Sequence, residues 1–318
     1  MKQIACSVIV ALNPHHNDLA VVFDAYFGQT ADSASFEVIV VNGGARDHVD
    51  RVYDEHRRRF PRTPVRLLNV DGNGRAAANN AGAQSSRSDL LLFVGDDFIP
   101  AATLVRAHIE LHRNLLRGTG VGIGPSFFPD ALRLDPFRCW LEDSGQLFGV
   151  PFRLAAAHWP RKFFYAGNAS IDRELVDRVG GFDAALHDTG DDFEFGLRLS
   201  PTGACSHFLP KAVAWHDHPV TLPERLEAHR RSGECARNII ARHGEIAQWS
   251  KFLAQPLADF AAAALEAEDG HRTAPSPVSR IARYEALLEL AFAEGYHGVA
   301  AELDHGVAAE SMPASPGG

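Results

Sequence analysis

Residues 89–97, DLLLFVGDD, place an unbroken apolar run directly before two acidic side chains. The run from Asp89 to Val94 predicts a strand buried on both faces, as in the middle of a parallel sheet. Asp96 and Asp97 then follow at its carboxyl end. Adjacent carboxylates repel each other, so a divalent cation bound between them and a diphosphate would let both stay ionised. A helix N-cap at Asp97 is the competing interpretation.

The segments before this strand repeat the same alternation of strand and helix. Apolar runs predict strands at residues 6–12, 36–41 and 65–70, and charged or alanine-rich stretches predict helices at 18–27, 47–60 and 75–84. Repeated strand–helix units imply a parallel sheet with right-handed crossovers, whose ligands bind at the carboxyl ends of the strands. The polar residues expected at that edge are Asn13, Asn42, Asp71, Arg75, Asp96 and Asp97.

The rest of the chain has a weaker pattern. We expect a helix at 101–116, a strand at 121–128, an aromatic-rich segment at 135–164 that bears on acceptor choice, and helices at 222–252 and 280–303 joined by a linker at 269–279. The predicted organisation is a domain at 1–220, a C-terminal helical extension at 221–310 and a disordered tail at 311–318.

Composition excludes several classes of protein. The net charge of −9 and the lack of a basic stripe argue against nucleic acid as a partner. The four cysteines (Cys6, Cys139, Cys205 and Cys235) have no metal-like spacing and predict reduced thiols. The apolar start is read as a strand and not as a signal peptide, and no stretch is long enough to span a bilayer. We therefore expect a cytoplasmic protein, with peripheral membrane association left open.

Two further motifs carry candidate chemistry. Residues 190–199, GDDFEFGLRL, gather Asp191, Asp192 and Glu194 at the start of a predicted helix. Such acids complement the helix dipole, but one beside an acceptor hydroxyl can also act as a general base. Residues 215–219, WHDHP, contain His216 and His218, whose imidazoles either bind a metal or lie at the surface.

Taken in order, these segments resemble the family-2 glycosyltransferases with the GT-A type fold. The matching stretches are SVIVALN (7–13), FEVIVVNGG (36–44), GRAAANNAG (74–82), LLLFVGDDFIP (90–100), AGNASIDRELVDRVGGFD (166–183), TGDDFEFGLRL (189–199) and AVAWHDHP (212–219). The resemblance implies an α/β, Rossmann-like fold with a mostly parallel sheet flanked by helices. It also implies a hexosyltransferase-class enzyme that uses a nucleotide-diphosphate sugar and inverts the anomeric configuration.

The resemblance also implies roles for the candidate residues. Asp97 would bind Mn²⁺ or Mg²⁺, and His218 or His216 would complete the metal site. Asp192, with Asp191 beside it, would be the catalytic base. The expected donor contacts are Asn13, Asn42, Asp71, Arg75, Asp96, Asn168 and Glu194. The sequence departs from the family at Gly95, where a leading Asp is usual, and at Asn42-Gly43, where an Asp pair is common.

The sequence leaves several points open. The donor is UDP-, GDP- or dTDP-linked, and the acceptor is a glycan, a lipid-linked molecule or a small molecule. The missing leading Asp keeps a catalytically silent sugar-nucleotide-binding protein as one alternative. A nucleotidyltransferase is the other, although the ALNPHHND loop after the first strand lacks the glycine-rich basic character that such enzymes carry there.

Overall fold

The computed structural model describes residues 4–12, 19–32, 35–43, 49–61, 64–71, 74–116, 120–153, 164–186, 189–244 and 246–298. The chain divides into two compact units, Met1–Arg225 and Leu226–Gly318. The tail predicted to be disordered, 311–318, lies outside the described residues, as does Asn13. No helix in the described ranges combines the length and apolar composition needed to cross a membrane.

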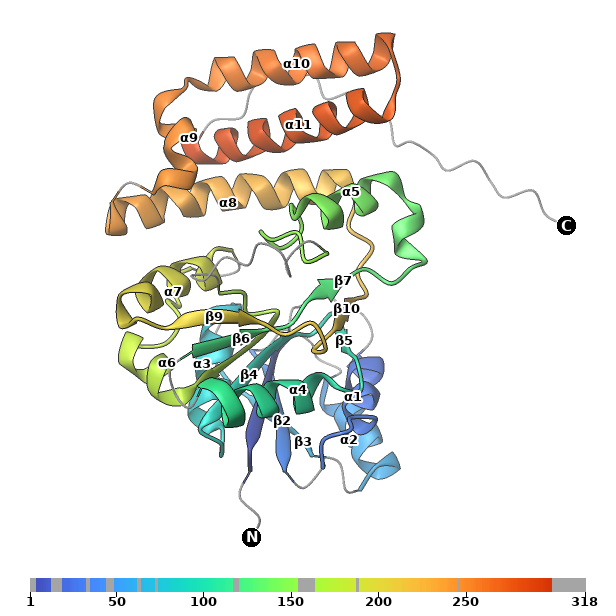
Figure 1. Cartoon of the computed structure of the whole chain (residues 1–318), viewed down its shortest axis with the longest axis vertical. Coiled ribbons are helices and arrows are strands. Elements are labelled where there is room, and N and C mark those ends of the chain that lie inside the picture. Colours follow the sequence, from blue (N-terminus) through green and yellow to red (C-terminus); the bar gives the residue numbers. More distant parts are fainter. Residues whose placement is uncertain are drawn as a thin grey trace, which may run out of the picture. The chain divides into compact units, whose positions relative to one another are not determined.

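The first unit is built on a seven-stranded sheet flanked by helices (Figure 1). In spatial order its strands are β3 (Val65–Asn69), β2 (Phe36–Asn42), β1 (Cys6–Ala11), β4 (Leu90–Gly95), β8 (Asn168–Asp172), β6 (Gly120–Ile123) and β9 (Cys205–Phe208). Every residue of β1 and β2 is buried, as their continuous apolar runs predict. The first four strands pair in parallel, β3 with β2, β2 with β1 and β1 with β4, while β8 runs antiparallel to both its neighbours, β4 and β6. The predicted mostly parallel sheet is therefore confirmed.

The helices of this unit are α1 (Leu19–Phe27), α2 (Val49–Arg59), α3 (Arg75–Ser85), α4 (Leu104–Leu111) with a π-helical turn at His112–Leu116, α5 (Pro136–Ser144), α6 (Arg173–Val179) and α7 (Asp191–Leu199). Single 3₁₀ turns occur at Leu132–Leu134 and Ser200–Thr202. Helix α3 lies very close to the sheet, because a Cβ atom at Gly82 would meet the side chains of Ile9 and Val41. The small residues of α3 therefore allow this close approach.

A second, three-stranded sheet lies beyond the end of β4. It consists of β5 (Phe98–Pro100), β10 (Ala214–His216) and β7 (Ser126–Phe127), with β10 in the middle. The single strand predicted at 121–128 is in fact two strands, β6 and β7, which belong to different sheets. Because β5 follows Asp97 directly and pairs with β10, this small sheet brings distant segments to the end of β4.

The second unit is helical. After α8 (Leu222–His243), which crosses the boundary between the units, come a 3₁₀ turn at Ala247–Trp249 and helices α9 (Ser250–Ala254), α10 (Leu257–Thr273) and α11 (Pro277–His297). Helix α8 ends earlier than predicted, where Gly244 has a left-handed φ of 81°. The predicted linker 269–279 is wrong for most of its length, because α10 continues to Thr273 and α11 begins at Pro277.

Two glycines let α11 pack against α8 within this unit. A Cβ atom at Gly295 would collide with the carbonyl oxygen of Arg230, and one at Gly233 would collide with the carbonyl oxygen of Phe292. Beside this crossing, Nε of Arg230 lies 2.6 Å from a carboxylate oxygen of the buried Glu294. Helices α10 and α11 lie side by side (Figure 1).

Candidate active site

The acidic pair forms the turn between the two sheets. Gly95 ends β4, and a side chain there would collide with the ring of Phe98. Asp97 is then fixed twice to the end of β10: its Oδ2 lies 2.8 Å from Nε2 of His216, and its carbonyl oxygen accepts a hydrogen bond from the amide of Asp217 at 2.9 Å. The structure thus brings together two predicted metal ligands that are far apart in the sequence.

His216 sits in an aromatic cage and is only 5% exposed. The rings of Phe98, Phe148 and Phe128 have centroids 5.0, 5.3 and 5.4 Å from its own. Its Nδ1 is buried and has no hydrogen-bond partner among the residues that the structure describes. A bound ion or ligand group would complete the bonding capacity of this imidazole.

The residues at this point fit a divalent metal that is shared with a phosphate ligand. A carboxylate oxygen and an imidazole nitrogen, from Asp97 and His216, are both metal-ligand atoms. Within the described ranges, no group of three or more His, Cys, Asp and Glu side chains is arranged to hold a metal. Mg²⁺ commonly binds through one or two protein ligands together with substrate phosphates, so Asp97 and His216 would suffice to hold a metal that a phosphate ligand shares. The ring of His218 lies farther out, 5.8 Å from that of His216.

The acidic cluster opens helix α7, which starts after the left-handed Gly190. Asp191 is fully buried and accepts two hydrogen bonds from the guanidinium of Arg75, one of them at 3.2 Å. Glu194, also buried, pairs with Arg198 at 2.6 Å one turn along the helix. The buried carboxylates of Asp191 and Glu194 are therefore each neutralised by an arginine that is more exposed than they are.

Asp192 is partly buried and lies beside this ion pair. Burial raises the pKa of its carboxyl above the usual value; Arg75 opposes this rise and Asp191 reinforces it. Backbone amides of Phe193, at 2.8 Å, and Ala166 donate hydrogen bonds to the carboxylate. A fixed carboxylate whose pKa is raised towards neutrality is suited to accept a proton.

Tyr165, the first residue of the turn from Tyr165 to Gly167, escaped the sequence interpretation. This turn precedes β8 and lies between the two acidic elements, because the carbonyl oxygen of Gly167 accepts a hydrogen bond from Gly95 and Ala166 contacts Asp192. A signal for it exists in the sequence, since Tyr165 directly precedes the AGNASIDRE motif. By composition alone, however, Tyr165 is one more aromatic residue next to the aromatic-rich segment at 135–164.

Asn168 was predicted to contact the donor, but its amide bonds within the fold. The side chain is fully buried, and its Nδ2 donates to the carbonyl oxygens of Ala212 at 2.8 Å and Pro125 at 3.3 Å. Its Oδ1 lies 3.1 Å from Nε2 of His108. In this structure Asn168 therefore ties β8 to its surroundings.

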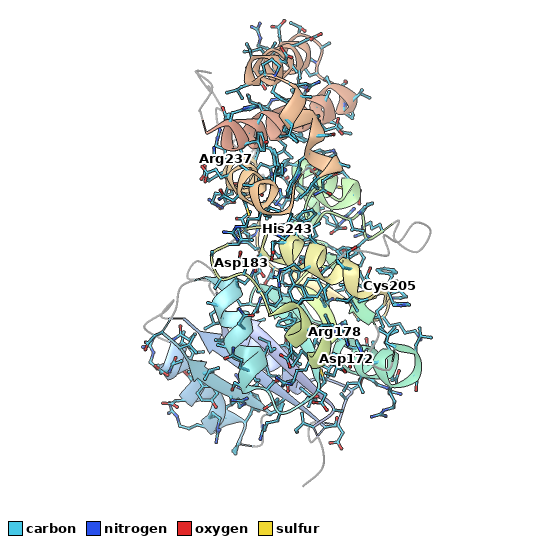
Figure 2. All side chains as sticks on the ribbon, turned by 90° about the vertical axis from the view of Figure 1, so that its left-hand side faces the viewer. Asp172, Arg178, Asp183, Cys205, Arg237 and His243 are labelled. Atoms are coloured by element: carbon cyan, nitrogen blue, oxygen red, sulfur yellow. The ribbon has the colours of Figure 1, made fainter. Side chains whose placement is uncertain are left out.

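Two histidines extend this buried network along β8. The Oγ of Ser170 lies 2.7 Å from Nδ1 of His108 and 2.9 Å from Nε2 of His112. Nδ1 of His112 then lies 3.1 Å from Asp172, the last residue of β8, which is labelled in Figure 2. Burial lowers the pKa of His108 to about 3, so this ring stays neutral.

The remaining predicted donor contacts lie at the carboxyl ends of β2 and β3. Asn42 is buried at the end of β2, where its Nδ2 donates to Oδ1 of Asn69 at 2.9 Å. Asp71 is exposed just beyond β3, and Asp96 is buried next to Asp97. These residues lie at the sheet edge that was predicted to bind ligand, and their contacts with a donor stay a prediction.

Comparison with known proteins finds a matching family model and several related sequences. The family model described as Glycosyl transferase family 2 matches residues 7–186. A Bacillus subtilis (strain 168) protein described as uncharacterized glycosyltransferase YfnE is 24% identical over 234 residues, which cover 58% of this chain and 58% of that protein. The hyaluronan synthase of Pasteurella multocida is 23% identical over 216 residues, covering 58% of this chain and 22% of the synthase. The chain thus spans little more than half of one relative and about a fifth of the other.

Among solved structures, the mannosyltransferase PcManGT from Pyrobaculum calidifontis, in complex with GDP-Man and Mn²⁺, superposes with a TM-score of 0.64. The two chains are 20% identical, and the match covers 92% of this chain and 86% of the mannosyltransferase. At this level of identity the likeness describes the fold.

Proposed function

The chain belongs to glycosyl transferase family 2, and on that premise we propose that it transfers a sugar from a nucleoside diphosphate sugar to an acceptor hydroxyl, with inversion and with the help of a divalent metal. The observation that carries the proposal is that one turn, Tyr165–Gly167, bonds both to Asp192 and to the end of β4, beside the Asp97–His216 pair. Metal-ligand atoms and a candidate base are the parts that such a transfer needs.

In the proposed reaction Asp192 takes the proton of the acceptor hydroxyl. The acceptor oxygen then bonds to the anomeric carbon, while the bond from that carbon to the diphosphate breaks and the nucleoside diphosphate leaves with the electron pair. Attack from the side opposite the leaving group inverts the configuration. The metal, held by Asp97 and His216, would neutralise the charge of the departing diphosphate.

Other residues have supporting roles in this proposal. The ion pair between Arg75 and the buried Asp191 keeps the start of α7 in place, and both charges act on the pKa of Asp192. Asn42, Asp71 and Asp96 are proposed to line the nucleotide at the sheet edge, where ligands bind in open parallel sheets. Asn13, whose structure is outside the described residues, is proposed for the same edge.

The experiment is a donor screen. Purified protein is incubated with Mn²⁺ and a panel of UDP-, GDP- and dTDP-sugars, starting with GDP-mannose because the Pyrobaculum mannosyltransferase holds it. Release of free nucleoside diphosphate is measured with and without a chelator. We expect release from one donor that the chelator abolishes and that Asp192→Asn removes. Asp177→Asn, on the exposed side of α6, is the matched control and should behave like the wild-type protein.

Two additions to this screen, donor calorimetry and incubation with a nucleoside triphosphate and a sugar phosphate, distinguish the two alternatives. A silent sugar-nucleotide-binding protein would bind a donor in calorimetry yet release no diphosphate from any of them. A nucleotidyltransferase would produce pyrophosphate from a nucleoside triphosphate and a sugar phosphate. Either result would replace the proposed transfer reaction.

A further inference from the structure

The turn from Tyr165 to Gly167 connects the metal side of the candidate site to the base side. The carbonyl oxygen of Gly167 accepts a hydrogen bond from the amide of Gly95 at 3.2 Å, just before the acidic pair. The amide of Ala166 donates to the carboxylate of Asp192. These three consecutive residues therefore contact both the end of β4, which carries the acidic pair, and Asp192 at the start of α7. The distance between these two elements must be fixed if metal and base are to act in one transfer reaction.

The ring of Tyr165 shares its packing partners with His216. Its centroid lies 5.0 Å from that of Phe148 and 6.3 Å from that of Phe98. The same two rings contact His216 at 5.3 and 5.0 Å. A displacement of Tyr165 would therefore be passed to His216 through rigid aromatic side chains, since closely packed interiors transmit strain.

The hydroxyl of Tyr165 lies next to Ser126 of β7. It is buried, and a Cβ atom at Gly167 would collide with it, so the glycine makes the space that the phenol occupies. Burial raises the pKa of the phenol well above its usual value; the charges of Asp97 and Asp192 add to this rise, while Ser126 and Arg75 oppose it. The group therefore stays neutral and offers an O–H dipole at this point.

We propose that Tyr165 is a positioning residue, which holds the Asp97–His216 pair and Asp192 at a fixed separation through its ring and its hydroxyl. The proposal rests on the proposed function, because the separation matters only if metal and base act on one donor–acceptor pair. In-line attack requires the base and the leaving group to be aligned, and a misplacement of about 1 Å can cost about a hundredfold in rate.

Tyr165→Phe tests the hydroxyl while keeping the ring. We expect kcat to fall about tenfold, as for about 1.4 kcal/mol of lost transition-state stabilisation, with the donor KM within about twofold of wild type. The contact of the hydroxyl with Ser126 helps to fix the turn whose Ala166 amide donates to Asp192 and lowers the pKa of that carboxyl. Losing this contact should weaken the amide bond and raise the pKa of Asp192, so the acid limb of the kcat profile should move to higher pH. The charged groups acting on Asp192, Arg75 and Asp191, are unchanged in this variant.

Tyr26→Phe is the matched control, because Tyr26 in α1 is also buried with a buried hydroxyl. It should leave kcat and the acid limb unchanged. Gly167→Ala supplies a second perturbation, since it keeps the phenol but displaces it, and should also lower kcat. If Tyr165 only packed the core, its replacement would lower thermal stability and leave the pH profile of kcat unchanged.

A carbon-13 NMR titration of Asp192, assigned by the signal lost in Asp192→Asn, needs no turnover. We expect the Asp192 carboxyl to titrate at higher pH in Tyr165→Phe than in the wild-type protein. In Tyr26→Phe it should titrate at the same pH as in the wild-type protein. Unchanged titration, or wild-type kcat and acid limb in Tyr165→Phe, would overturn the positioning role. If the wild-type protein releases no diphosphate, the proposed function fails by its own screen, and the titration still decides whether Tyr165 acts on Asp192.

Discussion

Replacing Asp192 by asparagine should remove catalysis and leave the fold at least as stable as before. Asparagine has the size of the carboxylate and can still accept hydrogen bonds from the amides of Phe193 and Ala166. It cannot take a proton from an acceptor hydroxyl. Loss of a general base typically costs about 10²–10⁴-fold in rate, which corresponds to about 3–5 kcal/mol of activation free energy.

The stability change follows from the direction in which the pKa moves on folding. Burial and Asp191 raise the pKa of Asp192 in the folded protein, so the folded state binds this proton more tightly than the unfolded chain. The free energy of unfolding therefore falls as pH rises from the unfolded value, about 3.9, through the raised folded value. At neutral pH the ionised carboxylate is destabilising, by about 1.4 kcal/mol for each tenfold gain in proton affinity on folding. Asparagine removes that destabilisation.

Three measurements check the reasoning together. Diphosphate release gives kcat, calorimetry gives the donor Kd in the presence of Mn²⁺, and scanning calorimetry gives Tm at pH 7.5 and pH 4. A gain of about 1 kcal/mol should raise Tm by roughly 2–4 °C at pH 7.5, and the gain should shrink at pH 4. The reasoning is refuted if kcat stays within tenfold of wild type, or if Tm at pH 7.5 drops by several degrees.

Three further predictions address other parts of the chain. Asp97→Asn and His216→Gln should each raise the Mn²⁺ concentration needed for half-maximal diphosphate release by about tenfold or more, as for one lost ligand contact; an unchanged Mn²⁺ titration would exclude that residue as a ligand. The pKa of His108 is lowered to about 3, so as pH falls below about 6.5 the unfolded chain takes up a proton at this side chain before the folded protein does. The free energy of unfolding, measured by urea titration, should therefore fall by up to about 5 kcal/mol between about pH 6.5 and about pH 3. His108→Gln should flatten this pH dependence. Gly295→Ala should force α11 away from α8 and destabilise the second unit, whereas Gly270→Ala, which meets nothing within 4 Å, should be neutral or stabilising by urea titration.

Much of the first unit follows from its apolar runs. Segments such as 36–41 and 89–94 are continuous because β2 and β4 are covered on both faces, and the repeated strand–helix units predict the parallel order of the strands. The family resemblance and the GT-A type fold expected from the ordered motifs are likewise confirmed.

The helical unit was predicted less well. Ser276 and Pro277 were interpreted as part of a loop, yet they start a helix. The Ser276 side chain accepts from the amide of Ser279 in a capping box, and proline is well placed in a first helical turn. Polar residues at 269–273 belong to the solvent-facing end of α10.

The candidate site was predictable where sequence order carried the information and not where packing did. Asp97 follows the apolar run of β4, and His216 lies in one of the ordered motifs of the family resemblance, so a shared site could be expected. The pairing of Arg75 with Asp191 joins segments far apart in the chain, and no local pattern announces it. Asn168 was assigned to the donor by the family resemblance, and a strand buried on both faces, as β8 is, does not reveal from its sequence which way its polar residues point.

The hydrogen bond between Gly95 and Gly167 also has a consequence for biosynthesis. Strands β1 to β4 are consecutive, so a nascent chain can pair them soon after they leave the ribosome, whereas β8 must close a long loop before it can insert beside β4. We expect the acidic pair to be in place early, on a compact but inactive intermediate. The arrangement of metal ligands and base would then be completed only when the Tyr165–Gly167 turn docks, which makes the appearance of activity a late event in folding.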